Sequence, residues 1–280
     1  MLDANATETR GLFIPADLDE GLKLDRVDAG AFINRGTAKL NLQDYEGAIS
    51  DFDYGLRLDP KDVLAYANRG VARGQLGDYR GEITDATSAI ALDPDFAAAY
   101  ANRAFAYLGR SALADAQADL DHALKISPGD ADYLRLRSQV LFAQGNFSAA
   151  AEDFAQVILS NPEGLEERCL FALALRRSGQ SEVRAGLATI LPALPDSWNK
   201  TIGLFLTGDL SELNLMVEAN RGDPTTLHSR QCAACYFAGE MHLLQNDVPG
   251  ARSLFQKSLN AGDALCPEYT LAAAELARLK

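Results

Sequence analysis

The chain has 280 residues, of which 48% are hydrophobic and 23% are charged, and this composition is sufficient for a large folded core. Asp and Glu outnumber Lys and Arg by 39 to 26, so the formal net charge is −13. This acidic balance argues against proteins that hold nucleic-acid phosphates or anionic lipid surfaces. No apolar run approaches the ~20 residues of a membrane span, and the N-terminus lacks the basic and apolar segments of a signal peptide.

Residues 1–24 are acidic and irregular, and we expect an arm or a partly disordered segment there. A strict period follows in residues 25–162, where four prolines recur every 34 residues: Pro60, Pro94, Pro128 and Pro162. Each stretch between prolines has apolar residues three and four apart, which predicts two amphipathic helices per repeat. Gly77 and Gly145 are expected at the turns between the two helices, and the proline ends the second helix.

This pattern resembles the tetratricopeptide repeat (TPR) family. The first helices carry Phe32, Tyr66 and Tyr100 at the aromatic position and Gly36, Gly70 and Ala104 at the small position, and Phe52 and Phe154 stand at the bulky position of the second helices. The resemblance implies an all-α fold, a right-handed superhelical solenoid of about six helix pairs with a C-terminal capping helix. Glu82 departs from the pattern at a small-residue site, and we expect its stem to fill that space while its carboxylate reaches solvent.

The period weakens in residues 163–225, where two degenerate helical pairs are expected around Gly179 and Gly208. Residues 226–280 return to the pattern as a C-terminal repeat and a capping helix that starts at Pro267. In this last helix we expect one face to pack against the repeat and the other to stay polar and exposed. The packed face has Tyr269, Ala272, Leu276 and Leu279, and the polar face has Glu268, Glu275 and Arg278.

The second half also resembles the NlpI-type TPR lipoproteins of Gram-negative bacteria, through the run from Lys200 to Ser211, the segment Cys235–Glu240 and the segment Ala251–Phe255. That resemblance implies a non-enzymatic adaptor that recruits envelope hydrolases to a protease, forms a homodimer and reaches the membrane only through a lipid anchor. The alternative is a cytoplasmic TPR adaptor or regulator with an unrelated client. The visible sequence favours the cytoplasm, and an envelope location requires a signal peptide that has been removed.

Two charged columns run through the repeats in register, and we expect them to form ion pairs that fix the stacking of helices, since Arg can bind a carboxylate through two donors. The columns are Arg35, Arg69, Arg103 and Arg137, and Asp51, Asp85, Asp119 and Asp153.

A third column, Asn34, Asn68 and Asn102, lies on the first helices, which line the groove in TPR proteins. Asn both donates and accepts, so this column predicts binding of an extended peptide backbone; bonds to a neighbouring helix are the alternative. Phe105, Leu108 and Phe142 are expected to flank the groove. Some TPR co-chaperones hold a terminal carboxylate with lysines at positions that are here Gly30, Ile33, Leu64, Ala67, Ala98 and Ala101.

The sequence offers little support for catalysis, because only three histidines are present and no nucleotide-binding, hydrolase or metalloprotease motif occurs. We predict no catalytic residue, no metal, no cofactor, no small-molecule substrate and no nucleic-acid partner. Cys232 and Cys235 form a CxxC inside an expected helix, where core thiols are favoured over a disulfide, a metal site or a redox enzyme. The expected partner is a protein or an extended peptide.

Overall fold

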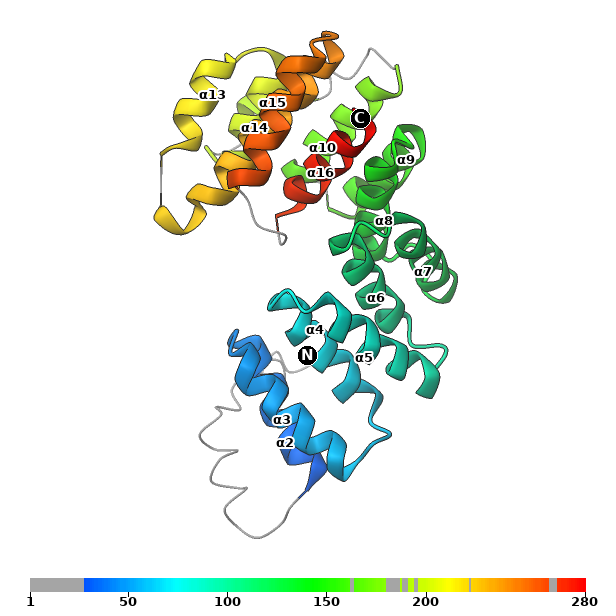
Figure 1. Ribbon diagram of the computed structural model, residues 1–280. Helices are drawn as coiled ribbons and strands as arrows, with labels where there is room; N and C mark the ends of the chain where they lie inside the picture. The colour runs from blue at the N-terminus through cyan, green and yellow to red at the C-terminus, as the bar shows by residue number, and fades with distance from the viewer. Residues whose placement is uncertain are drawn as a thin grey trace, which may run out of the picture. The chain divides into compact units, whose positions relative to one another are not determined.

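The computed structural model describes residues 28–161, 164–179, 187, 191–193, 196–221, 223–261 and 266–280. Within these residues the regular elements are all helical, as predicted (Figure 1). The chain divides into two compact units, residues 1–106 and 107–280. The predicted N-terminal arm, residues 1–24, lies outside the described residues. No described helix is both long enough and apolar enough to cross a membrane.

The first unit consists of helices from the regular repeats, with α2 packed on α3 and α4 on α5. Its helices are α2 (Ala29–Asn41), α3 (Tyr45–Leu58), α4 (Val63–Gln75) and α5 (Tyr79–Leu92), and α6 (Ala97–Gly109) runs across the division.

The second unit continues with helix pairs and ends with a single helix. Its helices are α7 (Leu113–Ile126), α8 (Ala131–Gln144), α9 (Phe147–Ser160), α10 (Leu165–Arg177), α12 (Trp198–Thr207), α13 (Glu212–Ala219), α14 (Leu227–Leu244), α15 (Val248–Ala261) and α16 (Pro267–Arg278), with short 3-10 turns at Leu191–Ala193 and Pro224–Thr226. Within the described residues, six helix pairs, the unpaired α10 between the fourth and fifth of them, and a terminal helix agree with the predicted solenoid. The expected partner of α10, residues 181–191, falls largely outside the described residues.

The helices begin and end where local chemistry favours it. Asp44, Asp62 and Asp78 accept hydrogen bonds from backbone N–H groups in the first turns of α3, α4 and α5. The left-handed turns predicted at Gly77 and Gly145 are present, with φ of 78° and 83°. The same conformation recurs every 34 residues, at Gln43, Gly77, Ser111, Gly145 and Gly179, so the backbone keeps the repeat even where glycine is absent.

Small and bulky residues pack as the repeat pattern predicts. Phe52 of α3 is fully buried against Gly36 of α2, where an added Cβ would lie 2.9 Å from the ring. The same arrangement recurs in the last pair, where a Cβ added to Gly239 of α14 would lie 2.6 Å from the ring of the fully buried Phe255 of α15. Glycine at these two positions allows close approach of the helices and burial of a whole aromatic ring.

The terminal helix α16 differs from the expectation in the face that it buries. Glu268 and Glu275, expected on an exposed polar face, are 9% and 1% exposed, together with Leu271 and Ala272. These four residues are spaced i, i+3, i+4 and i+7, so they lie on one face of the helix. The prediction failed because it assumed that charged side chains of a terminal helix stay in water. Arg177 of α10 instead pairs with Glu275 inside the protein.

Candidate peptide-binding face

The asparagine column lies on the first helices of the repeats in the first unit. Asn34 of α2 is exposed, and Asn68 of α4 and Asn102 of α6 are partly exposed. The side-chain amide of Asn68 donates to Oγ1 of Thr37 in the preceding repeat over 3.4 Å, a long hydrogen bond. The described residues offer no side-chain hydrogen bond to Asn34 or Asn102. Asn68 therefore does bond to a neighbouring helix, through one of its two amide N–H donors. The amides of Asn34 and Asn102 make no such bond within the described residues and are at least partly exposed.

Apolar side chains stand beside this column. Leu64, in the first turn of α4, is 58% exposed, and Ala67 is only 3% exposed. Phe105 of α6 is partly exposed and meets the ring of Tyr79 of α5 edge-on, with 6.4 Å between ring centroids. This part of the first unit thus combines the amides with the apolar side chains of Leu64 and Phe105.

Two of the residues expected to flank the groove belong to the second unit. Leu108 is 7% exposed, and Phe142 of α8 is 1% exposed within the main core. The ring of Phe142 packs against Phe147 of α9 with 4.8 Å between centroids. The residues that share the candidate face of the first unit are therefore Asn34, Asn68, Asn102, Phe105 and Leu64.

The arginine column is engaged in the predicted ion pairs. Arg35 donates to both carboxylate oxygens of Asp51, at 2.8 and 2.5 Å. Arg69 does the same to Asp85 at 3.0 and 2.6 Å, and Arg137 to Asp153 at 2.7 and 2.8 Å. The fourth expected pair, Arg103 with Asp119, spans the two units and stays a prediction.

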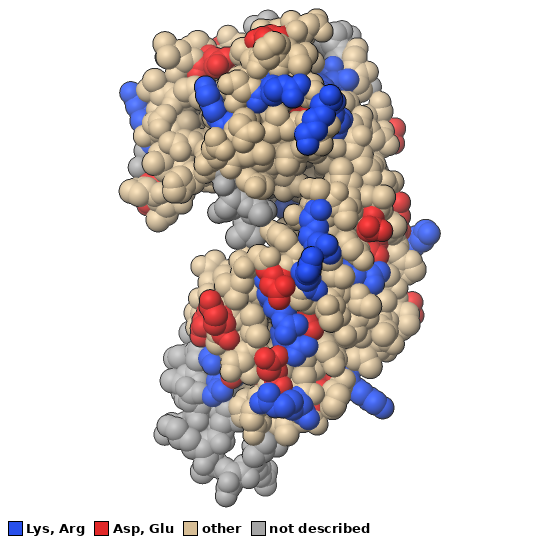
Figure 2. All heavy atoms as spheres, in the orientation of Figure 1, with Lys and Arg blue, Asp and Glu red and all other residues tan. Residues whose placement is uncertain are grey.

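The same arginines also reach back to the preceding repeat. Arg69 donates to Asp53 at 2.7 Å, Arg137 to Asp121 at 2.8 Å, and Arg103 to the hydroxyl of Thr87 at 3.2 Å. The hydrogen bonds that Arg137 donates to Asp153 and Asp121 raise its pKa. Acidic and basic side chains accordingly alternate over the lower part of the view in Figure 2 and form no field of one sign. The arginines on this face are thus engaged by neighbouring aspartates and by the hydroxyl of Thr87.

Glu82 contradicts the expectation that its carboxylate reaches solvent. The residue is 2% exposed, and its Oε2 has no hydrogen-bond partner within the described residues. The carboxylate occupies the space beside Gly74 of α4, where an added Cβ would lie 2.2 Å from Oε2. Desolvation raises the pKa of Glu82 to about 8, and the charge of Asp78 adds to this shift. Glu82 is therefore a protonated, buried acid at neutral pH.

The CxxC pair lies in the core of the second unit. Cys232 and Cys235 lie within α14 as buried thiols that form no disulfide, and Cys232 Sγ lies 3.3 Å from the hydroxyl of Ser258. Desolvation raises the pKa of Cys235, whereas a redox-active cysteine needs a lowered one. No group of three or more metal-ligating side chains occurs in the part of the chain that the structure describes.

Two clusters in the second unit escaped the sequence analysis because their members lie far apart in the chain. His242 of α14 contacts Asp247 through Nδ1 at 2.6 Å and Glu212 of α13 through Nε2 at 2.9 Å. These hydrogen bonds, the one to Asp247 first, raise the pKa of His242. The second cluster joins Arg177 to Glu240 and Glu275, which are 63 and 98 residues away. Either cluster becomes visible only when the packing of the helices is known.

Comparison with known proteins agrees with this architecture. A sequence model of the tetratricopeptide repeat family matches residues 33–95 and 102–166. A search of curated proteins finds no match. Among solved structures, a tetratricopeptide repeat protein from Parabacteroides merdae is 17% identical, with a TM-score of 0.61 over 88% of this chain and 98% of that chain.

Two further structures have similar folds. YrrB, described as a TPR protein with an unusual peptide-binding site, is 16% identical with a TM-score of 0.56 over 70% of this chain and 100% of its own. The MamA protein is 18% identical with a TM-score of 0.51 over 70% of this chain and 97% of its own. At such identities the likeness concerns the fold.

Proposed function

We propose that this chain, whose residues 33–95 and 102–166 match a tetratricopeptide repeat model, is a non-enzymatic scaffold that binds an extended segment of a client protein on its first unit. The supporting observation is the column Asn34, Asn68 and Asn102, whose amides lie at the surface of α2, α4 and α6 while the neighbouring arginines are held by aspartates. YrrB, a structure of similar fold, is described as having a peptide-binding site, which favours this class of partner.

The chemistry of the face suggests which part of the client it contacts. An amide offers one acceptor and two donors, which complement the C=O and N–H groups of an extended backbone. Leu64 and Phe105 supply apolar surface for one or two client side chains. Because Arg35 and Arg69 are engaged by Asp51 and Asp85, a client carboxylate gains no new ion pair here. We therefore expect an uncharged or weakly basic segment, recognised mainly through its backbone.

The experiment is a selection from a library of unstructured peptides, followed by fluorescence anisotropy with the selected peptide. The test variant replaces Asn34, Asn68 and Asn102 with Ala, and the matched control is Asn41→Ala, an exposed Asn at the end of α2 outside the column. Each lost hydrogen bond costs about 0.5–1.5 kcal/mol, so the triple variant should bind at least about tenfold more weakly.

Circular dichroism should show that both variants keep the helical fold. Undiminished binding by the triple variant would show that the Asn column is structural and that the client binds elsewhere.

The resemblance of the second half supports a finer proposal about the clients. In this finer proposal the chain is an NlpI-like scaffold that recruits envelope hydrolases and a processing protease. These partners carry out the hydrolysis and proteolysis, and the chain itself forms a homodimer. Capture from separate envelope and cytoplasmic fractions tests it. Envelope hydrolases or a protease that bind the wild type and not the triple variant support the envelope adaptor, whereas capture of cytoplasmic proteins alone supports the cytoplasmic alternative. Sedimentation equilibrium tests the homodimer.

A further inference from the structure

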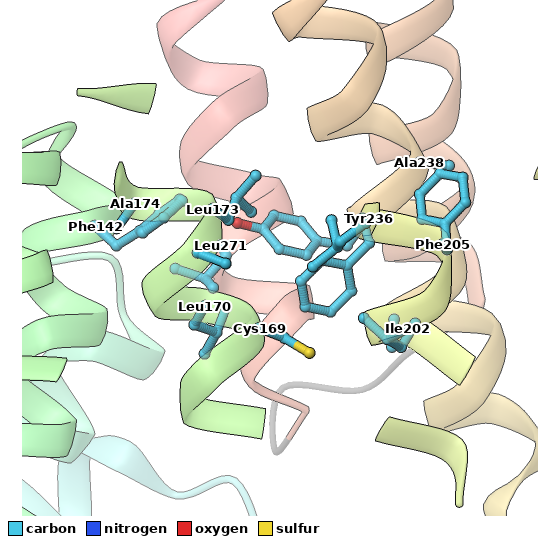
Figure 3. Close-up of a cluster of buried hydrophobic side chains, with 14 of the residues drawn as sticks. Phe142, Cys169, Leu170, Leu173, Ala174, Ile202, Phe205, Tyr236, Ala238 and Leu271 are labelled. Carbon is cyan, nitrogen blue, oxygen red and sulfur yellow. The ribbon is translucent and has the colours of Figure 1, made fainter. Parts of the chain in front are cut away.

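The terminal helix α16 packs not only on α15, which precedes it, but also on α14 and on α8, more than 120 residues earlier in the chain. Helices α8, α10 and α14 are the first helices of their pairs, and α16 lies against all three within the second unit (Figure 1). Figure 3 shows Leu271 of α16 among Leu170 and Leu173 of α10, with Tyr236 reaching in from α14. The position that a helical ligand would take on this face is thus held by the chain's own last helix.

Arg278 fixes the end of α16 to α8. Its Nη1 donates to the carbonyl oxygens of Phe142 at 3.2 Å and Ala143 at 2.6 Å. These carbonyls belong to the last turn of α8, where that of Phe142 also accepts a hydrogen bond from the N–H of Gly145 at 2.8 Å. The guanidinium also lies over the ring of Phe147, 5.5 Å from its centroid. A helix that binds here therefore needs an arginine near its C-terminal end to contact these carbonyl oxygens.

A second set of contacts is electrostatic. Arg177 of α10 pairs with Glu275 of α16 at 3.2 Å and also with Glu240 of α14, which is fully buried. Glu275 in turn pairs with Arg278 three residues later. The docked face of α16 therefore presents Leu271 and Ala272, followed by Glu275 and Arg278. Arg177 of α10 pairs with Glu275, and backbone carbonyls of α8 accept from Arg278.

Two side-chain oxygens of α14, the hydroxyl of Tyr236 and Oε1 of Glu240, are buried without a hydrogen-bond partner in the described residues. Buried ion pairs also return little net stability, because desolvation offsets most of their attraction. Another helix with the same Glu and Arg and a better match to Tyr236 can compete with α16 for this face.

We propose that the face formed by α8, α10 and α14 is a helix-binding site, that α16 is its resident ligand, and that an amphipathic partner helix with the pattern Leu-Ala-x-x-Glu-x-x-Arg displaces it. This site is separate from the face proposed above for an extended peptide. Replacing Asn34, Asn68 and Asn102 with Ala leaves it unchanged, so the two proposals fail independently.

The test uses the full chain and a fluorescein-labelled synthetic peptide with the sequence of residues 267–280. The matched control peptide has Gln in place of Glu275 and Arg278. The protein variant is Arg278→Ala, which removes the anchor of the resident helix and leaves Arg177, Glu240 and Tyr236 of the receiving face intact. A tethered helix competes at an effective concentration in the mM range, so we expect the variant to bind the peptide at least about tenfold more tightly than the wild type.

A second readout needs no variant. Cys266 precedes α16, is 8% exposed and donates to Glu268 at 3.2 Å, so its alkylation reports undocking of the helix. Mass spectrometry of the wild type should show faster modification of Cys266 with the peptide than with the control peptide. Equal binding of both peptides, or no binding and unchanged alkylation of Cys266, would overturn the proposal. A dimer that the peptide converts to monomers would identify a second copy as the occupant and would also overturn it.

Discussion

The two units present their first helices in different ways, although both follow the same repeat. In the first unit the face of α2 and α4 carries exposed Asn34 and Leu64. In the second unit the equivalent face of α8, α10 and α14 is covered by α16. Within the described residues, the same repeat therefore leaves one such face exposed and one covered, because α16 lies outside the period. Repetition determines the scaffold, and the non-repeating part determines which surface is available.

The largest effect should come from removing the aromatic ring that each unit buries against a glycine. Phe52→Ala in the first unit and Phe255→Ala in the second each remove a fully buried ring, at a cost of about 3–5 kcal/mol. We expect faster amide hydrogen exchange only in the unit that carries the change, measured by mass spectrometry of peptides. Equal acceleration throughout the chain in both variants would show that the two units unfold together.

A smaller effect is expected from the ion pairs that join the helices. Asp85, 1% exposed, accepts hydrogen bonds from Arg69 and Arg73, so Asp85→Asn should destabilise the first unit by about 2–4 kcal/mol in urea denaturation. The control is Asp132→Asn, whose ion pair with Arg135 is exposed and should matter by less than about 0.5 kcal/mol. A similar loss in both variants would mean that net charge, rather than the buried network, is responsible.

Glu82 makes the stability of the first unit depend on pH, and Ala116 and Ala150 stand at this repeat position in the second unit. Its pKa rises from 4.5 unfolded to about 8 folded. The folded state thus retains a proton that the unfolded chain has lost, and the stability of the first unit falls as pH rises between these values. Glu82→Gln should flatten this dependence and stabilise the protein at pH 8 by a few kcal/mol, on the order of 1.4 kcal/mol per pKa unit.

Urea denaturation at pH 5 and pH 8 is the measurement, with the exposed Glu46→Gln as control. An unchanged pH dependence in Glu82→Gln would show that this carboxylate is ionised in the folded protein.

The smallest effect belongs to His242, whose imidazole joins α13 to the turn between α14 and α15. Its folded pKa is raised by the hydrogen bonds with Asp247 and Glu212. The stabilisation is fully present below the unfolded value of 6.5 and is lost as pH rises through the folded value. Because the side chain is partly exposed, His242→Gln should cost less than about 1 kcal/mol at pH 5.5 and nothing at pH 9. Thermal melts at the two pH values measure the difference, and an equal loss at both would assign the effect to packing.

The fold could be predicted from the sequence to the level of helix pairs, turns and two polar columns. Gly77 and Gly145 mark left-handed turns because glycine tolerates positive φ. Arg35 and Asp51, Arg69 and Asp85, and Arg137 and Asp153 are 16 residues apart in each repeat, so one helix–turn–helix geometry brings all three pairs together. Local spacing suffices wherever both partners belong to the same repeat.

The candidate site was predictable only in part. The positions of Asn34, Asn68 and Asn102 on the first helices follow from the repeat, but their exposure depends on what covers those helices. The same reasoning placed Phe142 in the groove, and the structure buries it at 1% exposure. Nothing in the spacing of residues 131–144 could have indicated a cover that begins at Pro267.

The sequence by itself determined the repeating unit, because hydrophobic periodicity, capping aspartates and turn glycines act over fewer than 34 residues. Tertiary structure alone decided which charges are buried. Glu240 and Glu275 pair with Arg177 across 63 and 98 residues, whereas Oε2 of Glu82 has no hydrogen-bond partner in the part of the chain that the structure describes. The cost of burying a carboxylate depends on the charges and dipoles that surround it in space. That environment is set by the packing of helices that the linear pattern does not relate to one another.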